Sequence, residues 1–83
     1  MDKIAQYRKQ IDALDSQIMT LLDERFALSE RIGDIKRQSG KTVRDTTREQ
    51  AVLDKTSAYL HEASITTLYE TLMTISKKLQ KKG

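Results

Sequence analysis

The chain has 83 residues, a formal net charge of +3, no cysteine and a single histidine. This length fits one small domain spanning residues 1–83, and a domain of this size buries only a modest core, so a long amphipathic helix within it needs a partner. The composition excludes a disulfide, a thiolate nucleophile and a zinc site built from cysteine and histidine.

A long first helix is indicated by an apolar pattern that repeats every seven residues. The two columns of the repeat are Ile4, Ile11, Ile18, Arg25 and Ile32, and Tyr7, Leu14, Leu21, Leu28 and Ile35. The pattern continues unbroken until Gly40 in QSGK supplies a stop, which predicts a helix of about 36 residues, or roughly 54 Å. Because a globule of this size cannot cover such a helix, we expect an intertwined, paired assembly.

Two shorter helices are predicted after the loop KTVRDTT. Asp45 or Thr46 can cap a second helix that ends near Leu60. Thr46 and Glu49 also fit a capping box, which would explain the presence of Glu49 without any role in binding or catalysis. After a break at HEAS, where Ser64 is a candidate cap, apolar residues at helical spacing indicate a third helix almost to the end. The predicted fold class is all-α, with three helices per subunit of a homodimer.

Two cations of the first helix lack a counter-ion on that helix. The residues three and four positions from Arg25 are Leu21, Leu22, Leu28 and Ser29, and those around Lys36 are Ile32, Gly33, Ser39 and Gly40. Arg25 and Lys36 face the same way, roughly 16 Å apart along the axis, so both can converge on one small molecule. Alternatively, Arg25 sets the helix register or pairs with an acidic residue of another helix.

Further polar residues flank the apolar positions of the other two helices. Arg48 opens the second helix, where it can pair with Asp45 instead of a ligand. Ser76 and Gln80 lie one turn apart beside the apolar stripe of the third helix, although such residues are more often bonded to backbone or water. His61 falls in the predicted break and is expected at the surface.

Taken together and in order, these segments resemble the all-helical class of chorismate mutases. The resemblance is carried by YRKQIDALD, LLDERFALSERIGDIK, VRDTTRE and ISKKLQ, and it covers nearly the whole chain. It implies a homodimer whose two sites convert chorismate to prephenate in aromatic amino acid biosynthesis. This pericyclic rearrangement needs no nucleophile, metal or cofactor, but requires a compact substrate conformer and donors placed where negative charge develops. The chain would be a free-standing enzyme or the mutase domain of a larger shikimate-pathway protein.

The resemblance also implies roles for individual residues. Arg8, Arg25 and Arg48 match the arginines that bind the substrate carboxylates and order the site. Lys36 and Gln80 match the donors to the ether oxygen of the breaking bond. With Arg25, these two are the expected catalytic residues.

Three more positions complete the expected site. Glu49 matches the partner of the ring hydroxyl, and Asp45 and Ser76 match the remaining polar contacts. Arg8 precedes Arg25 by about 25 Å along a straight helix, so one chain cannot bring both to one small ligand. We therefore expect Arg8 to serve the other subunit's site.

Two other functions fit the same observations. An isochorismate-pyruvate lyase on this fold would bind a similar dicarboxylate, although the combination of Asp45, Arg48 and Glu49 favours the mutase. A non-catalytic regulatory helical dimer, binding nucleic acid through its lysines, is disfavoured by Arg25 and Lys36 on an inward face.

The composition favours neither a membrane nor a nucleic acid as a partner. No apolar run approaches membrane-spanning length, and the opening residues MDKIAQYRKQ lack the apolar core of a signal peptide, so we expect a cytoplasmic protein. Acidic and basic residues are interspersed through most of the chain, and the basic cluster KKLQKK is explained equally well as a solvated helix end.

Overall fold

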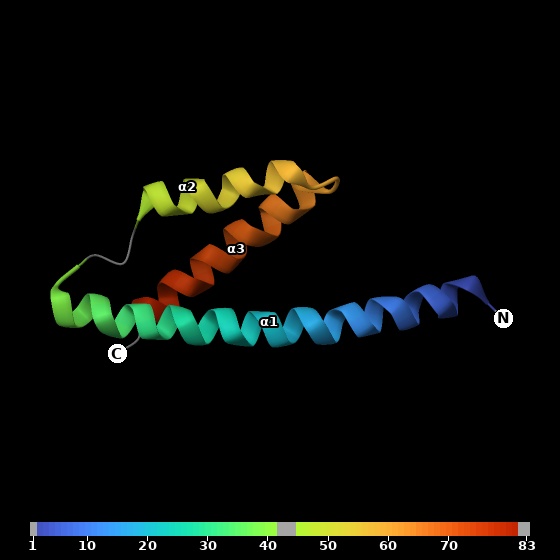
Figure 1. Ribbon diagram of the computed structural model, residues 1–83, viewed down its shortest axis with the longest axis horizontal. Helices are drawn as coiled ribbons and strands as arrows, with labels where there is room; N and C mark the ends of the chain where they lie inside the picture. The colour runs from blue at the N-terminus through green and yellow to red at the C-terminus, as the bar shows by residue number, and fades with distance from the viewer. Residues whose placement is uncertain (1, 42–44, 82–83) are drawn as a thin grey trace.

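The computed structural model describes residues 2–41 and 45–81, so three residues of the predicted loop, 42–44, lie outside the described part. The elements are α1 (Lys3–Ser39), α2 (Thr46–Asp54), a 3₁₀ turn η1 (Lys55–Ala58) and α3 (Glu62–Lys81). Figure 1 shows α1 along the whole length of the molecule, with α3 crossing it obliquely near its C-terminal end. No strand occurs in the described ranges, and the predicted all-α, three-helix fold is confirmed.

The ends of α1 are set by local contacts. The Asp2 side chain accepts a hydrogen bond from the Ile4 N–H at 2.9 Å and caps the first turn. At the other end, Gly40 adopts the left-handed conformation with φ 68°, and its N–H donates to the Lys36 carbonyl. The predicted stop at Gly40 is confirmed, because a residue without Cβ adopts this conformation at no steric cost.

The second helix is shorter than predicted. It ends at Asp54 rather than near Leu60, and the chain continues as η1. The buried Thr56 explains the change, because its hydroxyl donates to the Leu53 carbonyl at 2.8 Å and accepts from the Thr66 hydroxyl at 2.9 Å. These bonds tighten the turn and tie it to α3.

The third helix begins earlier than predicted. Its first residue is Glu62, so Ser64 lies inside the helix and is not its cap. The Ile65 N–H already donates to the His61 carbonyl at 3.0 Å, which starts the helical hydrogen bonding one turn ahead of that serine. His61 is exposed in the turn before α3, as predicted.

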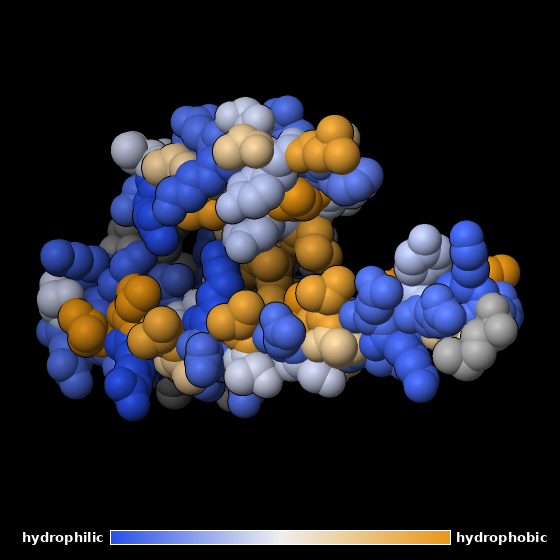
Figure 2. Space-filling model, turned by 45° about the vertical axis from the view of Figure 1, so that its right-hand side comes forward, coloured by the Kyte–Doolittle hydropathy of each residue, from blue (hydrophilic) through white to orange (hydrophobic). Residues whose placement is uncertain are grey.

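The chain by itself leaves much of its apolar surface exposed. Leu72, 7% exposed, is the one buried apolar side chain within residues 2–41 and 45–81. The radius of gyration is 16.2 Å, whereas about 12 Å is typical of a compact domain of this length. Figure 2 shows apolar side chains along the part of α1 that borders the hollow between α1 and the other helices, and around that hollow. The exposed ones on α1 include Ile4, Tyr7, Ile11, Leu14, Ile18, Leu21, Leu28, Ile32 and Ile35.

The backbones of α1 and α3 approach closely at one point. A Cβ placed on Gly33 would lie 2.5 Å from the Gln80 Cα. A side chain at position 33 would therefore push the end of α3 away from α1. This close approach brings the C-terminal turns of both helices to one side of the same hollow.

Candidate active site

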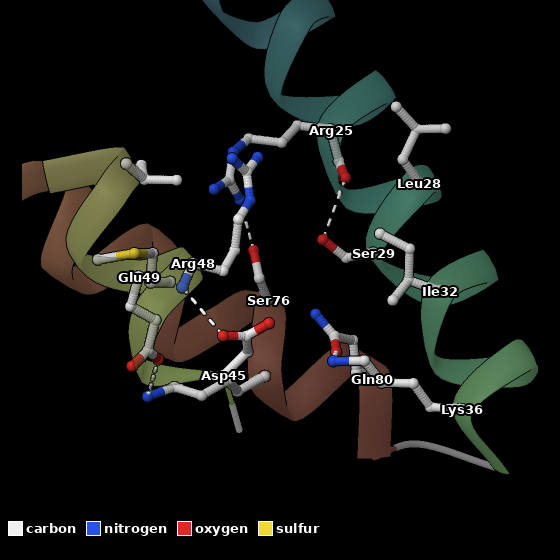
Figure 3. Close-up of a pocket in the computed structure, with 13 residues that line it drawn as sticks. Arg25, Leu28, Ser29, Ile32, Lys36, Asp45, Arg48, Glu49, Ser76 and Gln80 are labelled. Carbon is white, nitrogen blue, oxygen red and sulfur yellow. Dashed lines mark hydrogen bonds and ion pairs between the residues drawn. The ribbon is translucent and has the colours of Figure 1, made fainter. Parts of the chain in front are cut away.

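A pocket of about 410 Å³ lies between the three helices, a volume suited to a small organic ligand. Figure 3 shows α1 as one wall, the start of α2 as the opposite wall, and α3 between them. The lining residues are Arg25, Leu28, Ser29, Ile32 and Lys36 from α1, Asp45, Arg48, Glu49 and Val52 from the start of α2, and Met73, Ser76, Lys77 and Gln80 from α3.

Seven of the eight residues expected in the site line this pocket. The exception is Arg8, which is exposed on the N-terminal part of α1. That part of the helix extends beyond the other two helices, as Figure 1 shows. Within one chain the fold therefore separates Arg8 from the pocket, as the length of the helix required.

Arg25 is held between a hydroxyl and an aromatic ring. Its guanidinium donates to the Ser76 Oγ at 2.5 Å and lies 5.8 Å from the centroid of the Tyr69 ring. Ser76 is only 6% exposed, so the hydroxyl that holds the guanidinium is itself buried. The contacts of Arg25 in the described ranges include no carboxylate, which does not favour an ion pair with another helix of the same subunit.

Lys36 and Gln80 meet across the junction of α1 and α3. The Lys36 ammonium donates to the Gln80 Oε1 at 3.2 Å, and the Arg37 guanidinium donates to the Gln80 backbone carbonyl at 2.5 Å. Since its side-chain oxygen is engaged by Lys36, the amide N–H groups of Gln80 remain as donors toward a ligand. Both side chains thus supply N–H donors to the same end of the pocket.

Asp45 organises the opposite wall as the N-cap of α2. Its Oδ1 accepts a hydrogen bond from the Arg48 N–H at 2.9 Å, and its backbone carbonyl accepts from the Glu49 N–H at 3.0 Å. The predicted capping box of Thr46 and Glu49 is wrong, because the N-cap is Asp45, one residue earlier, and its side chain accepts the hydrogen bond from the first turn of the helix. The Glu49 carboxylate is therefore not the group that caps α2. Figure 3 shows the Arg48 and Arg25 side chains extending into the pocket from opposite walls.

One pocket residue, Lys77, was missed in the sequence. It forms an ion pair with Glu49, with Nζ 2.7 Å from Oε1. The sequence signal available was its place directly after Ser76, but that did not distinguish it from the exposed Lys78. Four cations now face two carboxylates in the pocket lining, so the site carries an excess of positive charge that favours an anionic ligand.

Neither a metal site nor a membrane segment is found among the described residues. Within residues 2–41 and 45–81, no three histidine, cysteine, aspartate or glutamate side chains are grouped so that they could hold a metal ion. Over the same ranges, no helix combines the length and the apolar character needed to cross a membrane.

The fold and the pocket define an all-helical protein with a site for a small anion. The chain belongs to the chorismate mutase type II family, whose model matches residues 7–81. It is 30% identical over 86 residues to a chorismate mutase of Methanocaldococcus jannaschii, covering 98% of this chain and 87% of the relative. It is also 36% identical over 55 residues to a bifunctional chorismate mutase/prephenate dehydratase of Aquifex aeolicus, covering 66% of this chain and 15% of that protein. The resemblance seen in the sequence is confirmed.

Proposed function

We propose that this chain catalyses the rearrangement of chorismate to prephenate. The observation that carries the proposal is the single pocket in which seven residues expected for this reaction come together from three helices. Chorismate is a dicarboxylate, and the excess of cations in the pocket offsets its charge. The lyase and regulatory alternatives have no comparable support from the structure or the relatives.

We assign binding of the substrate carboxylates to Arg25 and Arg48. Arg25 and Arg48 extend from opposite walls, so that they can bind one compact dicarboxylate between them. Ser76 holds Arg25 in place through its hydroxyl. Because the rearrangement requires the two reacting ends of the substrate to approach each other, binding in this conformation lowers the entropic part of the barrier.

We assign stabilisation of the negative charge that develops on the substrate to Lys36 and Gln80. As the bond to the ether oxygen breaks, that oxygen gains negative charge, and N–H donors already in place stabilise it without reorganisation. The hydrogen bond of 3.2 Å between the two side chains keeps both donors at one end of the pocket. Glu49 accepts a hydrogen bond from the ring hydroxyl, and Asp45 provides a polar contact and fixes the first turn of α2.

We also propose that the working form is a homodimer in which the partner subunit's Arg8 completes each site. The exposed apolar columns of α1 support this assembly, because a second α1 can cover them. If two α1 helices cross antiparallel at about residue 20, the partner subunit's Arg8 faces about residue 32. Ile32 lines the pocket between Arg25 and Lys36.

A further enzyme of the shikimate pathway is a candidate partner, whether fused or associated. The support is the match to the bifunctional relative, which covers only a small part of that protein. Co-purification with prephenate-consuming activity from the native source would test it.

The function is tested by adding the purified protein to chorismate. We expect loss of chorismate absorbance with stoichiometric appearance of prephenate, and no conversion would refute the proposal. A parallel incubation with isochorismate separates the lyase, because release of pyruvate there, without turnover of chorismate, would assign the chain to that activity. Sedimentation velocity at micromolar concentration tests the dimer, and a compact monomer would contradict it.

A further inference from the structure

Lys77 lies in the pocket without a part in the proposed reaction. Its ammonium is 2.7 Å from the Glu49 Oε1, and the two side chains are 32% and 22% exposed. The pair joins the first turns of α2 to the last turns of α3. Lys77 therefore contacts one of the residues assigned to the substrate.

The position of the Glu49 carboxylate depends on this contact. Oε1 is buried, and within the described residues the ammonium of Lys77, 2.7 Å away, is the group that compensates its lost hydration. Within residues 2–41 and 45–81, the side-chain cap of α2 comes from Asp45 and not from Glu49. Without Lys77, this buried oxygen would lose the charge that compensates it.

The charge of the ligand gives a second reason to expect a role for Lys77. Glu49 is a carboxylate in a pocket that we assign to a dicarboxylate, and like charges in a partly buried site repel one another. An ammonium in contact with Glu49 offsets that repulsion while the carboxylate keeps its capacity to accept hydrogen bonds.

We propose that Lys77 is a positioning residue that acts through Glu49. It binds Oε1 and leaves Oε2 as the acceptor for the ring hydroxyl of the substrate. The inference rests on the proposed function, in which Glu49 recognises that hydroxyl. It makes hydroxyl recognition a joint property of α2 and α3.

The test is a double-mutant cycle with a matched control. Lys77→Met, Lys77→Arg, Glu49→Gln and the double variant Glu49→Gln/Lys77→Met are compared with wild type, and Lys78→Met serves as control because Lys78 is the exposed neighbour. The measurements are kcat/KM for chorismate, the melting temperature, and Kd for prephenate, the product that retains the ring hydroxyl. The Kd values complete the cycle if Glu49→Gln turns over too slowly.

We expect Lys77→Met to lower kcat/KM at least about tenfold, since a charge-assisted contact of this kind is lost. Lys77→Arg should restore most of the activity, and Lys78→Met should match wild type. In the Glu49→Gln background, Lys77→Met should change kcat/KM and Kd by less than about twofold, because the residue through which it acts is already altered.

Four results would overturn the inference. An undiminished effect of Lys77→Met in the Glu49→Gln background would show that Lys77 binds the substrate itself. A lowered melting temperature with unchanged kcat/KM would show that the ion pair serves only helix packing. A wild-type protein without chorismate turnover would overturn the proposed function together with this inference, whereas active wild type with fully active Lys77→Met would overturn this inference alone.

Discussion

A site shared between subunits can be tested by mixing two inactive variants. Arg8→Ala and Lys36→Ala each remove one cation from every site of a homodimer. Arg8 and Lys36 lie on one helix, but about 42 Å apart at 1.5 Å per residue, so a single ligand cannot bind both within one chain. We expect each homodimer to lose at least about 100-fold in kcat, as is typical when a charge-stabilising donor is removed.

The expected recovery follows from the geometry. In a heterodimer of the two variants, one site keeps both residues and the other lacks both. Random reassociation of an equal mixture makes about half of all dimers hetero, and each has one complete site, so activity should return to about a quarter of wild type. A mixture of Arg25→Ala with Lys36→Ala should stay inactive, because both residues line the same pocket of one chain.

The assay unfolds the two variants together in urea, refolds them and measures chorismate consumption. Different affinity tags on the two variants allow the heterodimer fraction to be verified. Persistent inactivity with heterodimers present would refute the shared site, and so would full activity of Arg8→Ala alone.

Three further predictions follow from individual contacts. Arg25→Leu should reduce kcat/KM at least about 100-fold while the melting temperature stays or rises, because leucine completes the apolar column; a large fall in melting temperature would instead indicate a structural role. Gly33→Ala should lower kcat at least about tenfold and cost about 1–3 kcal/mol in urea unfolding, because its Cβ would meet the Gln80 backbone; an unchanged kcat would contradict the close approach. Leu72→Ala should cost about 2–5 kcal/mol in the same unfolding assay, since it removes a buried side chain, and a loss below about 1 kcal/mol would show that the site is not packed.

Helix α1 and part of the candidate site could be anticipated from local patterns, whereas the remaining site residues were expected from the family resemblance. The seven-residue repeat and Gly40 predicted the course and the end of α1, and the helical period alone puts Arg25 and Lys36 on one face. The cap at Asp45 was one of two expected alternatives. Such features depend on interactions between residues a few positions apart, so the local sequence is enough to predict them.

The features that sequence reasoning missed depend on contacts between distant segments. Thr56 turns the end of the second helix into η1 because its hydroxyl meets Thr66 of α3. Lys77 became distinguishable from Lys78 only when folding brought it to the carboxylate of Glu49. A sequence pattern gives the face on which a side chain lies, but the partner on another helix is determined by the helix crossing, which depends on packing of the whole subunit.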